Sequence, residues 1–171
     1  MIKKTKNNIR LSFSISLIIL LFSSAASYFS IVKLLESEQW VSHTFKVLEN
    51  LDFIISRIKD AETGQRGYLL TGDKVFLEPY TGSQNDVMNA LYEAEHLTSD
   101  NQNQQRDFPR LEILVSHKYK FIKKTIKDEE IGIPVTTAYL LSGKGIMDSI
   151  RSVVKVMKKR EETLLTTRQS K

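Results

Sequence analysis

Four polar side chains that follow a run of helical apolar residues could form a charged layer inside a helical bundle: Glu62, Thr63, Gln65 and Arg66. Glu62 and Arg66 are four residues apart, and side chains with this spacing meet on one face of a helix. When the apolar spacing that precedes them is extended, it reaches Glu62 and Gln65. These groups offer ion pairing and hydrogen bonding, and nothing about them points to a bond-making reaction.

Two interpretations of this cluster are open. In the first, Glu62 and Arg66 form an exposed ion pair worth a few tenths of a kcal/mol. In the second, they join Thr63 and Gln65 in an inner polar layer that fixes the register of the helices or holds two alternative packings. We favour the inner layer, and we treat these four residues as the candidate ligand-binding or signalling site.

The sequence offers little support for catalysis or for a cofactor. It contains no cysteine, no glycine-rich phosphate loop, no HExxH and no Gly-x-Ser-x-Gly motif. The three histidines, His43, His96 and His117, have no spacing that would bring them together around a metal ion. We therefore predict a domain with no catalytic residue, no metal and no cofactor.

The positive charge of the chain is concentrated before its apolar segment. The sequence has 25 basic and 20 acidic residues, and four of the basic ones, Lys3, Lys4, Lys6 and Arg10, lie in residues 1–10. The rest of the chain is therefore almost neutral. Such a cluster is a signal of membrane orientation and not of nucleic-acid binding.

Residues 11–32, from Leu11 to Val32, form a run of 22 residues without a charge. At helical rise they span about 33 Å, enough to cross the hydrocarbon core of a membrane. We predict a transmembrane helix here, with residues 1–10 in the cytoplasm and residues 33–171 outside it. The alternative is a cleaved signal peptide ending near Ser24-Ala25-Ala26.

The exported part is predicted to be helical, because its sequence contains few glycines and prolines. Gly64 and Gly67 interrupt the apolar pattern of the first helix, and they indicate either close packing or a hinge. From Lys33 to Leu70 the apolar residues recur at the spacing of a bundle helix: Val41, Leu48, Leu51, Ile55, Ile58 and Leu69.

A short cassette occurs twice in the chain. Tyr68–Gly72 (YLLTG) returns as Tyr139–Gly143 (YLLSG). Gly72 and Gly143 suit the left-handed position that ends a helix, and Asp73 is a plausible N-cap for the segment that follows. The cassettes therefore predict the far turns of two helical hairpins, at residues 33–100 and 106–170.

Turn signals divide these hairpins further. We expect a short turn at Asp73–Leu77, a helix from about Pro79 to Thr98 and a polar connection at Ser99–Gln105. A third helix should begin near Asp107, and Gly132-Ile133-Pro134 should kink or interrupt it. The predicted fold is all-α: an N-terminal transmembrane helix leading into an extracytoplasmic antiparallel four-helix bundle.

Several segments resemble one known family. They are Trp40–Thr44 (WVSHT), Asp60–Gly72 (DAETGQRGYLLTG), Phe76–Tyr80 (FLEPY) and Gly143–Arg151 (GKGIMDSIR). Together they resemble the CHASE domain of type 3, a cyclase/histidine-kinase-associated sensory extracellular domain. The resemblance covers about residues 33–170.

The resemblance implies an extracytoplasmic sensory domain in a bacterial inner-membrane receptor, usually between two membrane helices. It implies a cytoplasmic output that is a histidine kinase, a nucleotide cyclase, a diguanylate cyclase or a chemotaxis transducer, and a homodimeric receptor. It supplies no ligand. The alternative is a single-anchored envelope adaptor or structural protein. An apolar run of about 20 residues encoded soon after Lys171 would favour the receptor.

Overall fold

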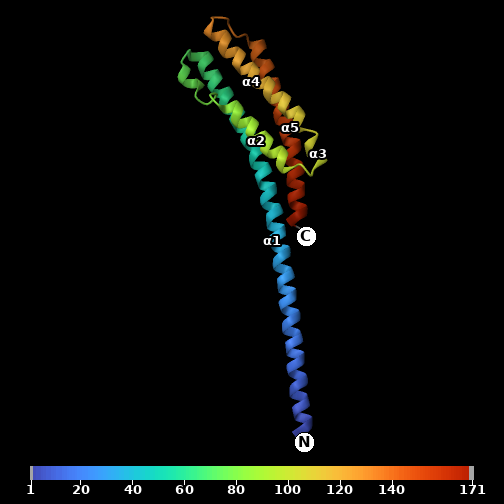
Figure 1. Cartoon of the computed structure of the whole chain (residues 1–171). Coiled ribbons are helices and arrows are strands. Elements are labelled where there is room, and N and C mark those ends of the chain that lie inside the picture. Colours follow the sequence, from blue (N-terminus) through green and yellow to red (C-terminus); the bar gives the residue numbers. More distant parts are fainter. Residues whose placement is uncertain (1, 170–171) are drawn as a thin grey trace. The chain divides into compact units, whose positions relative to one another are not determined.

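The computed structural model describes the backbone of residues 2–169 and the side chains of residues 11, 13–35 and 37–167. The basic side chains predicted to lie in the cytoplasm, at Lys3, Lys4, Lys6 and Arg10, fall outside the described side chains. The elements in chain order are α1 (Ile2–Thr71), the 3-10 turn η1 (Lys74–Leu77), α2 (Ser83–Leu97), α3 (Gln102–Gln105), α4 (Phe108–Glu130) and α5 (Thr137–Gln169) (Figure 1). No described residue is in a strand, and the predicted all-helical class is confirmed.

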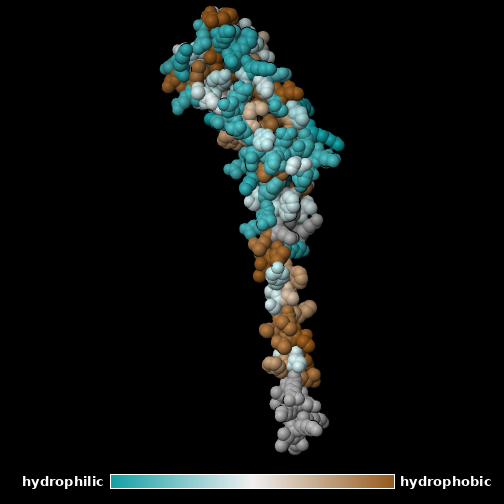
Figure 2. Space-filling model, viewed as in Figure 1, coloured by the Kyte–Doolittle hydropathy of each residue, from teal (hydrophilic) through white to brown (hydrophobic). Residues whose placement is uncertain are grey.

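The chain divides into two units, residues 1–41 and residues 42–171. The first unit is the N-terminal part of α1, and Figure 2 shows apolar side chains along its described surface. A window of 18 residues in this helix reaches a mean hydropathy of 2.1, and none of it is buried. Length and composition therefore suit a membrane span, although an N-terminal signal sequence would have the same properties.

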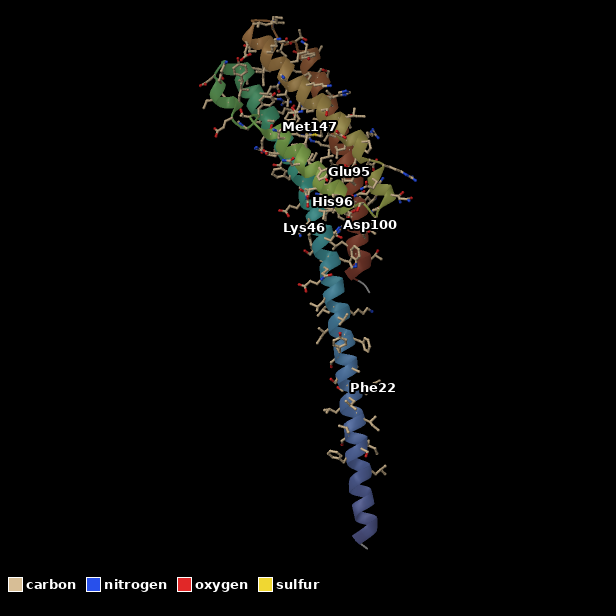
Figure 3. All side chains as sticks on the ribbon, in the orientation of Figure 1. Phe22, Lys46, Glu95, His96, Asp100 and Met147 are labelled. Carbon is tan, nitrogen blue, oxygen red and sulfur yellow. The ribbon has the colours of Figure 1, made fainter. Side chains whose placement is uncertain are left out.

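The second unit has one continuous core. Its α1 contribution falls on every third or fourth residue, the spacing that keeps side chains on one face of a helix. Met147 of α5 is fully buried in this unit (Figure 3). The buried apolar side chains come from α1 (Val47, Leu51, Ile54, Ile58, Ala61 and Tyr68), α2 (Val87, Ala90, Leu91 and Ala94), α4 (Phe108, Leu111, Val115, Tyr119, Phe121, Ile122 and Ile126) and α5 (Met147, Ile150, Val153, Val154 and Met157).

The buried face of α1 is rotated from the one that the sequence predicted. Leu51, Ile58 and Gln65 are buried as expected, whereas Leu48 and Ile55 are only half-buried. Val47 and Ile54, which directly precede Leu48 and Ile55, are fully buried instead. The apolar face of α1 is therefore wider than one residue per turn. As a result Glu62 lies on the flank of the core and Gln65 lies in it.

Ion pairs show which helices are neighbours. Arg57 of α1 contacts Asp86 of α2, with 2.5 Å between Nη2 and Oδ2. Asp52 of α1 contacts Lys158 of α5 at 2.6 Å. The Nη1 of Arg160 in α5 lies 2.5 Å from the Oδ2 of Asp107, which precedes α4. These pairs are partly exposed and contribute little to stability, so the apolar core holds the helices together.

The first cassette ends α1. Gly72 has φ +70°, and its N–H donates to the carbonyl of Tyr68 at 2.8 Å, which is the hydrogen bond of a left-handed helix cap. Asp73 then caps η1, because its Oδ1 accepts from the N–H of Val75 at 2.9 Å. The helix predicted from about Pro79 begins later, at Ser83, after a turn that contains Gly82 at φ +77°.

The second cassette does not turn the chain, and the prediction for Gly143 was wrong. Gly143 lies inside α5, and positive φ occurs instead at Gly132, which follows α4. There the N–H of Ile133 donates to Asp128 O at 2.8 Å, and the N–H of Gly132 donates to Glu129 O at 3.0 Å. This pair of hydrogen bonds is the Schellman motif, and it closes the helix before Pro134 prevents its continuation.

Candidate functional site

A lysine is fully buried in the middle of the second unit. The side chain of Lys118 in α4 is 0% exposed, and its Nζ lies 3.1 Å from the Oε2 of Glu62 in α1. The same Nζ donates to the carbonyl oxygen of Gly143 in α5 at 3.0 Å and lies 5.6 Å from the centre of the Phe121 ring. One cation thus connects three helices, and a buried charge of this kind requires all of its partners.

Glu62 links this buried lysine to the surface. Its side chain is 12% exposed, and its Oε1 accepts from the Nη2 of Arg66 at 2.6 Å. Arg66 itself is largely exposed. The carboxylate therefore has one buried and one exposed cation as partners, and a change at the surface near Arg66 would reach Lys118 through it.

Gln65 makes a separate buried polar contact between α1 and α4. It is 1% exposed, and its Nε2 lies 2.5 Å from the Oγ1 of Thr125 in α4. The Thr125 hydroxyl in turn donates to the carbonyl of Ile122 at 2.8 Å. Thr63 does not take part, because it is exposed and donates to the carbonyl of Lys59 within α1. Of the four residues predicted for the layer, Glu62 and Arg66 therefore pair with each other at the edge of the core, and Gln65 bonds to Thr125 within it. Thr63 takes part in neither contact.

Glycines allow the helices to approach this layer closely. A Cβ atom built on Gly143 would lie 2.3 Å from Cε1 of Phe121, so α5 can pack on the Phe121 ring only because position 143 has no side chain. Gly64 and Gly67 act in the same way toward η1, since a Cβ there would lie 2.3 Å from the carbonyl oxygen and 2.6 Å from the ring of Phe76, respectively. Of the two interpretations of Gly64 and Gly67, the structure supports close packing.

A second polar layer lies near the connection between α2 and α4. Gln104 of α3 is fully buried, and its Nε2 donates to the Met157 carbonyl and to the Oε1 of Glu161, both at 3.1 Å. Arg160 of α5 donates to the Gln104 side chain at 3.2 Å and also contacts Asp107. This layer joins the short helix α3 to α5 and is a structural contact.

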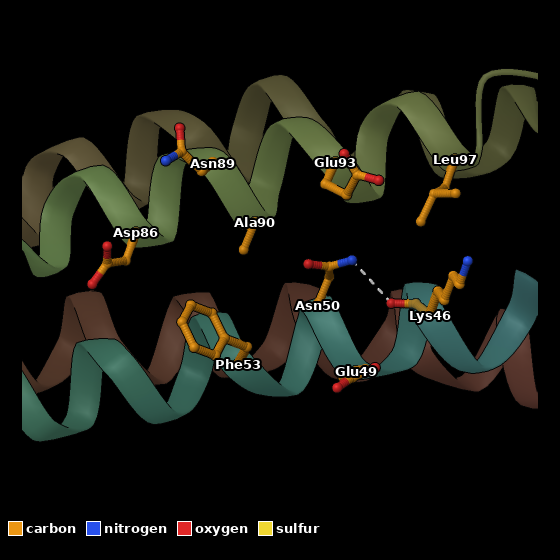
Figure 4. Close-up of a pocket in the computed structure, with 9 residues that line it drawn as sticks. All are labelled: Lys46, Glu49, Asn50, Phe53, Asp86, Asn89, Ala90, Glu93 and Leu97. Carbon is orange, nitrogen blue, oxygen red and sulfur yellow. Dashed lines mark hydrogen bonds between the residues drawn. The ribbon is translucent and has the colours of Figure 1, made fainter.

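The grooves on the second unit differ in charge. The groove between α1 and α2 has a volume of about 490 Å³ and carries more acidic than basic side chains, with Phe53 facing Ala90 across it (Figure 4). On the other side of α1 a groove of about 300 Å³ is lined by Lys59, Glu62, Thr63, Arg66, Lys144, Met147 and Arg151. This basic groove is where Glu62 and its partner Arg66 reach the surface.

Comparison with known families gives one decisive result. The family model described as the CHASE3 domain matches residues 37–171 of the chain. The chain belongs to the CHASE3 domain family. Domains of this family are extracellular sensory domains of signalling receptors. Comparisons with curated proteins and with solved structures gave no significant match.

In this CHASE3 domain, Glu62 and Gln65 have buried partners on α4 that the sequence analysis missed, Lys118 and Thr125 respectively. The signal that could have found them was present. The apolar spacing of α4 runs through Leu111, Val115 and Ile122, and its continuation places Lys118 and Thr125 on the buried face. The argument that selected Gln65 on the first helix would have selected both residues on this one.

Burial changes the acidity of Lys118 in the CHASE3 domain. Desolvation lowers the pKa of its ammonium group from the usual 10.5, because the charged form loses its hydration, and the attraction of Glu62 opposes this shift only in part. The lowered pKa means that the folded state binds the Lys118 proton less tightly than the unfolded state does.

This difference predicts a pH dependence of stability. Between the lowered pKa of folded Lys118 and about 10.5, the unfolded state binds more protons, so the free energy of unfolding should rise with pH. Below that window Lys118 is charged in both states and its burial cost is constant. The free energy of unfolding is measured in urea for the chain and for a Lys118→Met variant at a series of alkaline pH values. The value for the chain minus the value for the variant isolates the contribution of Lys118 and should rise with pH. If this difference falls as the pH rises, the assignment is contradicted.

Proposed function

We propose that the chain is the membrane-anchored input part of a bacterial signalling receptor, with residues 11–32 as the membrane span and residues 33–171 on the outer side. The observation that carries this proposal is the CHASE3 match over residues 37–171, which begins within α1, a helix whose N-terminal part is long and apolar enough to cross a membrane. The outputs expected for such a receptor are a histidine kinase, a nucleotide or diguanylate cyclase or a chemotaxis transducer. The sensory part itself carries out no chemistry.

We propose further that residues 42–171 form an antiparallel four-helix bundle of α1, α2, α4 and α5. The interhelical pairs support this arrangement: early α1 residues contact late α5 residues, as in Asp52–Lys158, while Glu62, later in α1, shares a groove with Arg151. Lys118 and Gly143 connect α4 to the beginning of α5, and Asp107 connects the start of α4 to Arg160, further along α5.

The relay we propose is a change of helix packing at the Glu62–Lys118 layer. Glu62 contacts both an exposed and a buried cation, so an event that withdraws Arg66 alters the charge balance around Lys118. Lys118 also holds α5 through the Gly143 carbonyl. A shift of α1 against α5 would follow, and two packings of similar free energy are what a receptor requires.

Topology can be tested with single cysteines, because the natural chain has none. We expect a Gln84→Cys variant to react with a membrane-impermeant maleimide in intact cells, since Gln84 is exposed near the start of α2. A Lys3→Cys variant should react only after the cells are permeabilised, and both variants should stay with the membranes after an alkaline wash. Release by that wash, or failure of Gln84→Cys to react in intact cells, would contradict the proposal.

A parallel homodimer is part of the proposal. Single cysteines at exposed positions of α1, for example Phe45→Cys and Phe53→Cys, should form cross-links between the same positions of two chains in membranes. A matched cysteine on the exposed face of α4, Ile113→Cys, serves as the control for random collision. If the α1 variants cross-link no more than the control, α1 does not form the interface.

A further inference from the structure

Two grooves, one basic and one mainly apolar, adjoin each other on the face shared by α1 and α5. The basic groove is lined by Lys59, Arg66, Lys144 and Arg151, and among its described lining residues the one carboxylate is Glu62. Because Glu62 is already engaged by Arg66 and by the buried Lys118, the cations are in excess. Lys144 and Arg151 share the exposed Asp148, which leaves a net positive charge on this surface.

The adjoining groove is mainly apolar. It has a volume of about 570 Å³ and lies between the end of α1 and the start of α5, and Glu129 is the one carboxylate among its described lining residues. Leu70 is 86% exposed and Leu141 is 60% exposed, so a patch of aliphatic side chains faces solvent here. A contiguous exposed apolar patch marks a binding surface more often than chance. The aliphatic lining comprises Leu69, Leu70, Pro134, Val135, Leu140 and Leu141.

Arg66 and Lys144 line both grooves, so they mark the boundary between the basic and the apolar part. A ligand that satisfies both parts needs an acidic head between these two cations and an aliphatic chain over Leu70 and Leu141. A neutral or basic ligand would gain nothing from the excess positive charge of the basic groove, and a small inorganic anion would leave the apolar groove in water.

We propose that this combined groove binds a small anionic amphiphile, a carboxylate carried on an aliphatic chain. The proposal rests on the proposed sensory function and names the class of stimulus for it. The carboxylate would compete with Glu62 for Arg66, and this competition would connect binding to the Glu62–Lys118 layer.

The test uses the full chain in nanodiscs of zwitterionic lipid, with decanoate as the probe and empty nanodiscs as the blank in calorimetric titrations. We expect one decanoate site per chain. Decanol, which lacks the charge, and acetate, which lacks the chain, should each bind at least tenfold more weakly. Octanoate should also bind more weakly, by up to about fourfold for each methylene removed.

Two variants address the two parts of the groove. Arg66→Gln/Lys144→Gln removes the exposed cations, and Leu70→Ser/Leu141→Ser removes the apolar patch; each should weaken decanoate binding at least tenfold. The matched control is Lys123→Gln/Lys155→Gln, which removes two exposed lysines that line neither groove and should leave the affinity unchanged. Because all six side chains are exposed, circular dichroism should show the same helix content in every variant.

Several results would overturn the proposal. They are decanoate binding no greater than the blank, equal binding of decanol, tight binding of inorganic phosphate without a chain, and unchanged decanoate affinity in Arg66→Gln/Lys144→Gln. A loss of self-association in Leu70→Ser/Leu141→Ser without decanoate binding would assign the groove to a second copy of the chain.

The failure of this proposal can be distinguished from that of the proposed function. If decanoate does not bind while Gln84→Cys is labelled from outside, the ligand class is wrong and the proposed function stands. If Gln84→Cys is not labelled, the proposed function fails whatever decanoate does.

Discussion

Replacing Glu62 by leucine should lower the free energy of unfolding by about 3 kcal/mol, because it leaves the Lys118 charge buried without a carboxylate. Among the described residues, Lys118 then keeps a hydrogen bond to the Gly143 carbonyl and a contact with the Phe121 ring, and neither neutralises an ammonium group. Part of the cost would be relieved by release of the proton, since the pKa of Lys118 is already lowered by burial. Urea unfolding followed by circular dichroism measures the effect.

The double variant Glu62→Leu/Lys118→Met tests whether the loss comes from the unpaired charge. Removing both partners of a buried pair and filling the space with apolar atoms is often neutral, so the double variant should return to within about 1 kcal/mol of the natural chain. Asp148→Asn is the control, since it removes a carboxylate that contacts two cations on the exposed surface, and it should change stability little. A double variant no more stable than Glu62→Leu would mean that Glu62 acts through something other than Lys118.

The buried polar residues of α1 show how far the sequence could predict the site. Gln65 follows from helical spacing alone, because its position continues the buried face of α1 through Leu51 and Ile58. Glu62 was placed in the core by the same spacing, yet it lies on the flank, where one carboxylate can contact both Lys118 and Arg66. When an apolar face is wider than one residue per turn, several sets of positions spaced by three and four residues fit it equally well. Only the packing of the other helices determines which set is fully buried.

The two cassettes show more clearly that a local sequence pattern does not determine where a helix ends. Gly72 and Gly143 follow almost the same four residues, but Gly72 ends a helix and Gly143 lies within one. What differs is the sequence that follows. Asp73 caps a new turn, whereas an apolar helical pattern continues beyond Gly143 and Gly132 has already closed α4. The need for glycine at position 143 comes from the ring of Phe121 on another helix, and no feature within the cassette reveals it.

That contact gives the second large effect: Gly143→Ala should lower the free energy of unfolding by about 1 to 2 kcal/mol. The new methyl group would meet the Phe121 ring at 2.3 Å, and overpacking of this kind costs about 1 to 3 kcal/mol. The higher helix propensity of alanine returns up to about 1 kcal/mol of this loss. The ring has little freedom to move aside, because it is buried and its centre lies 4.8 Å from that of Tyr139.

Gly145→Ala is the matched control, since it lies two residues further along the same helix and its added methyl group would have no atom within 4 Å beyond the neighbouring residues and the local helix backbone. It should gain stability from helix propensity alone, by up to about 1 kcal/mol. The opposite signs of the two substitutions separate close packing from the intrinsic cost of glycine in a helix.

A smaller partner should relieve the clash. Phe121→Leu alone opens space in the core and should destabilise the chain, but in the Gly143→Ala background it gives the methyl group room. The double variant should therefore lose less than the sum of the two single losses, with a coupling of about 1 kcal/mol in urea unfolding. Strict additivity, or a Gly143→Ala variant as stable as Gly145→Ala, would mean that α4 and α5 can separate freely at this point. The Lys118 hydrogen bond to the Gly143 carbonyl could not then couple a change at Glu62 to the position of α5.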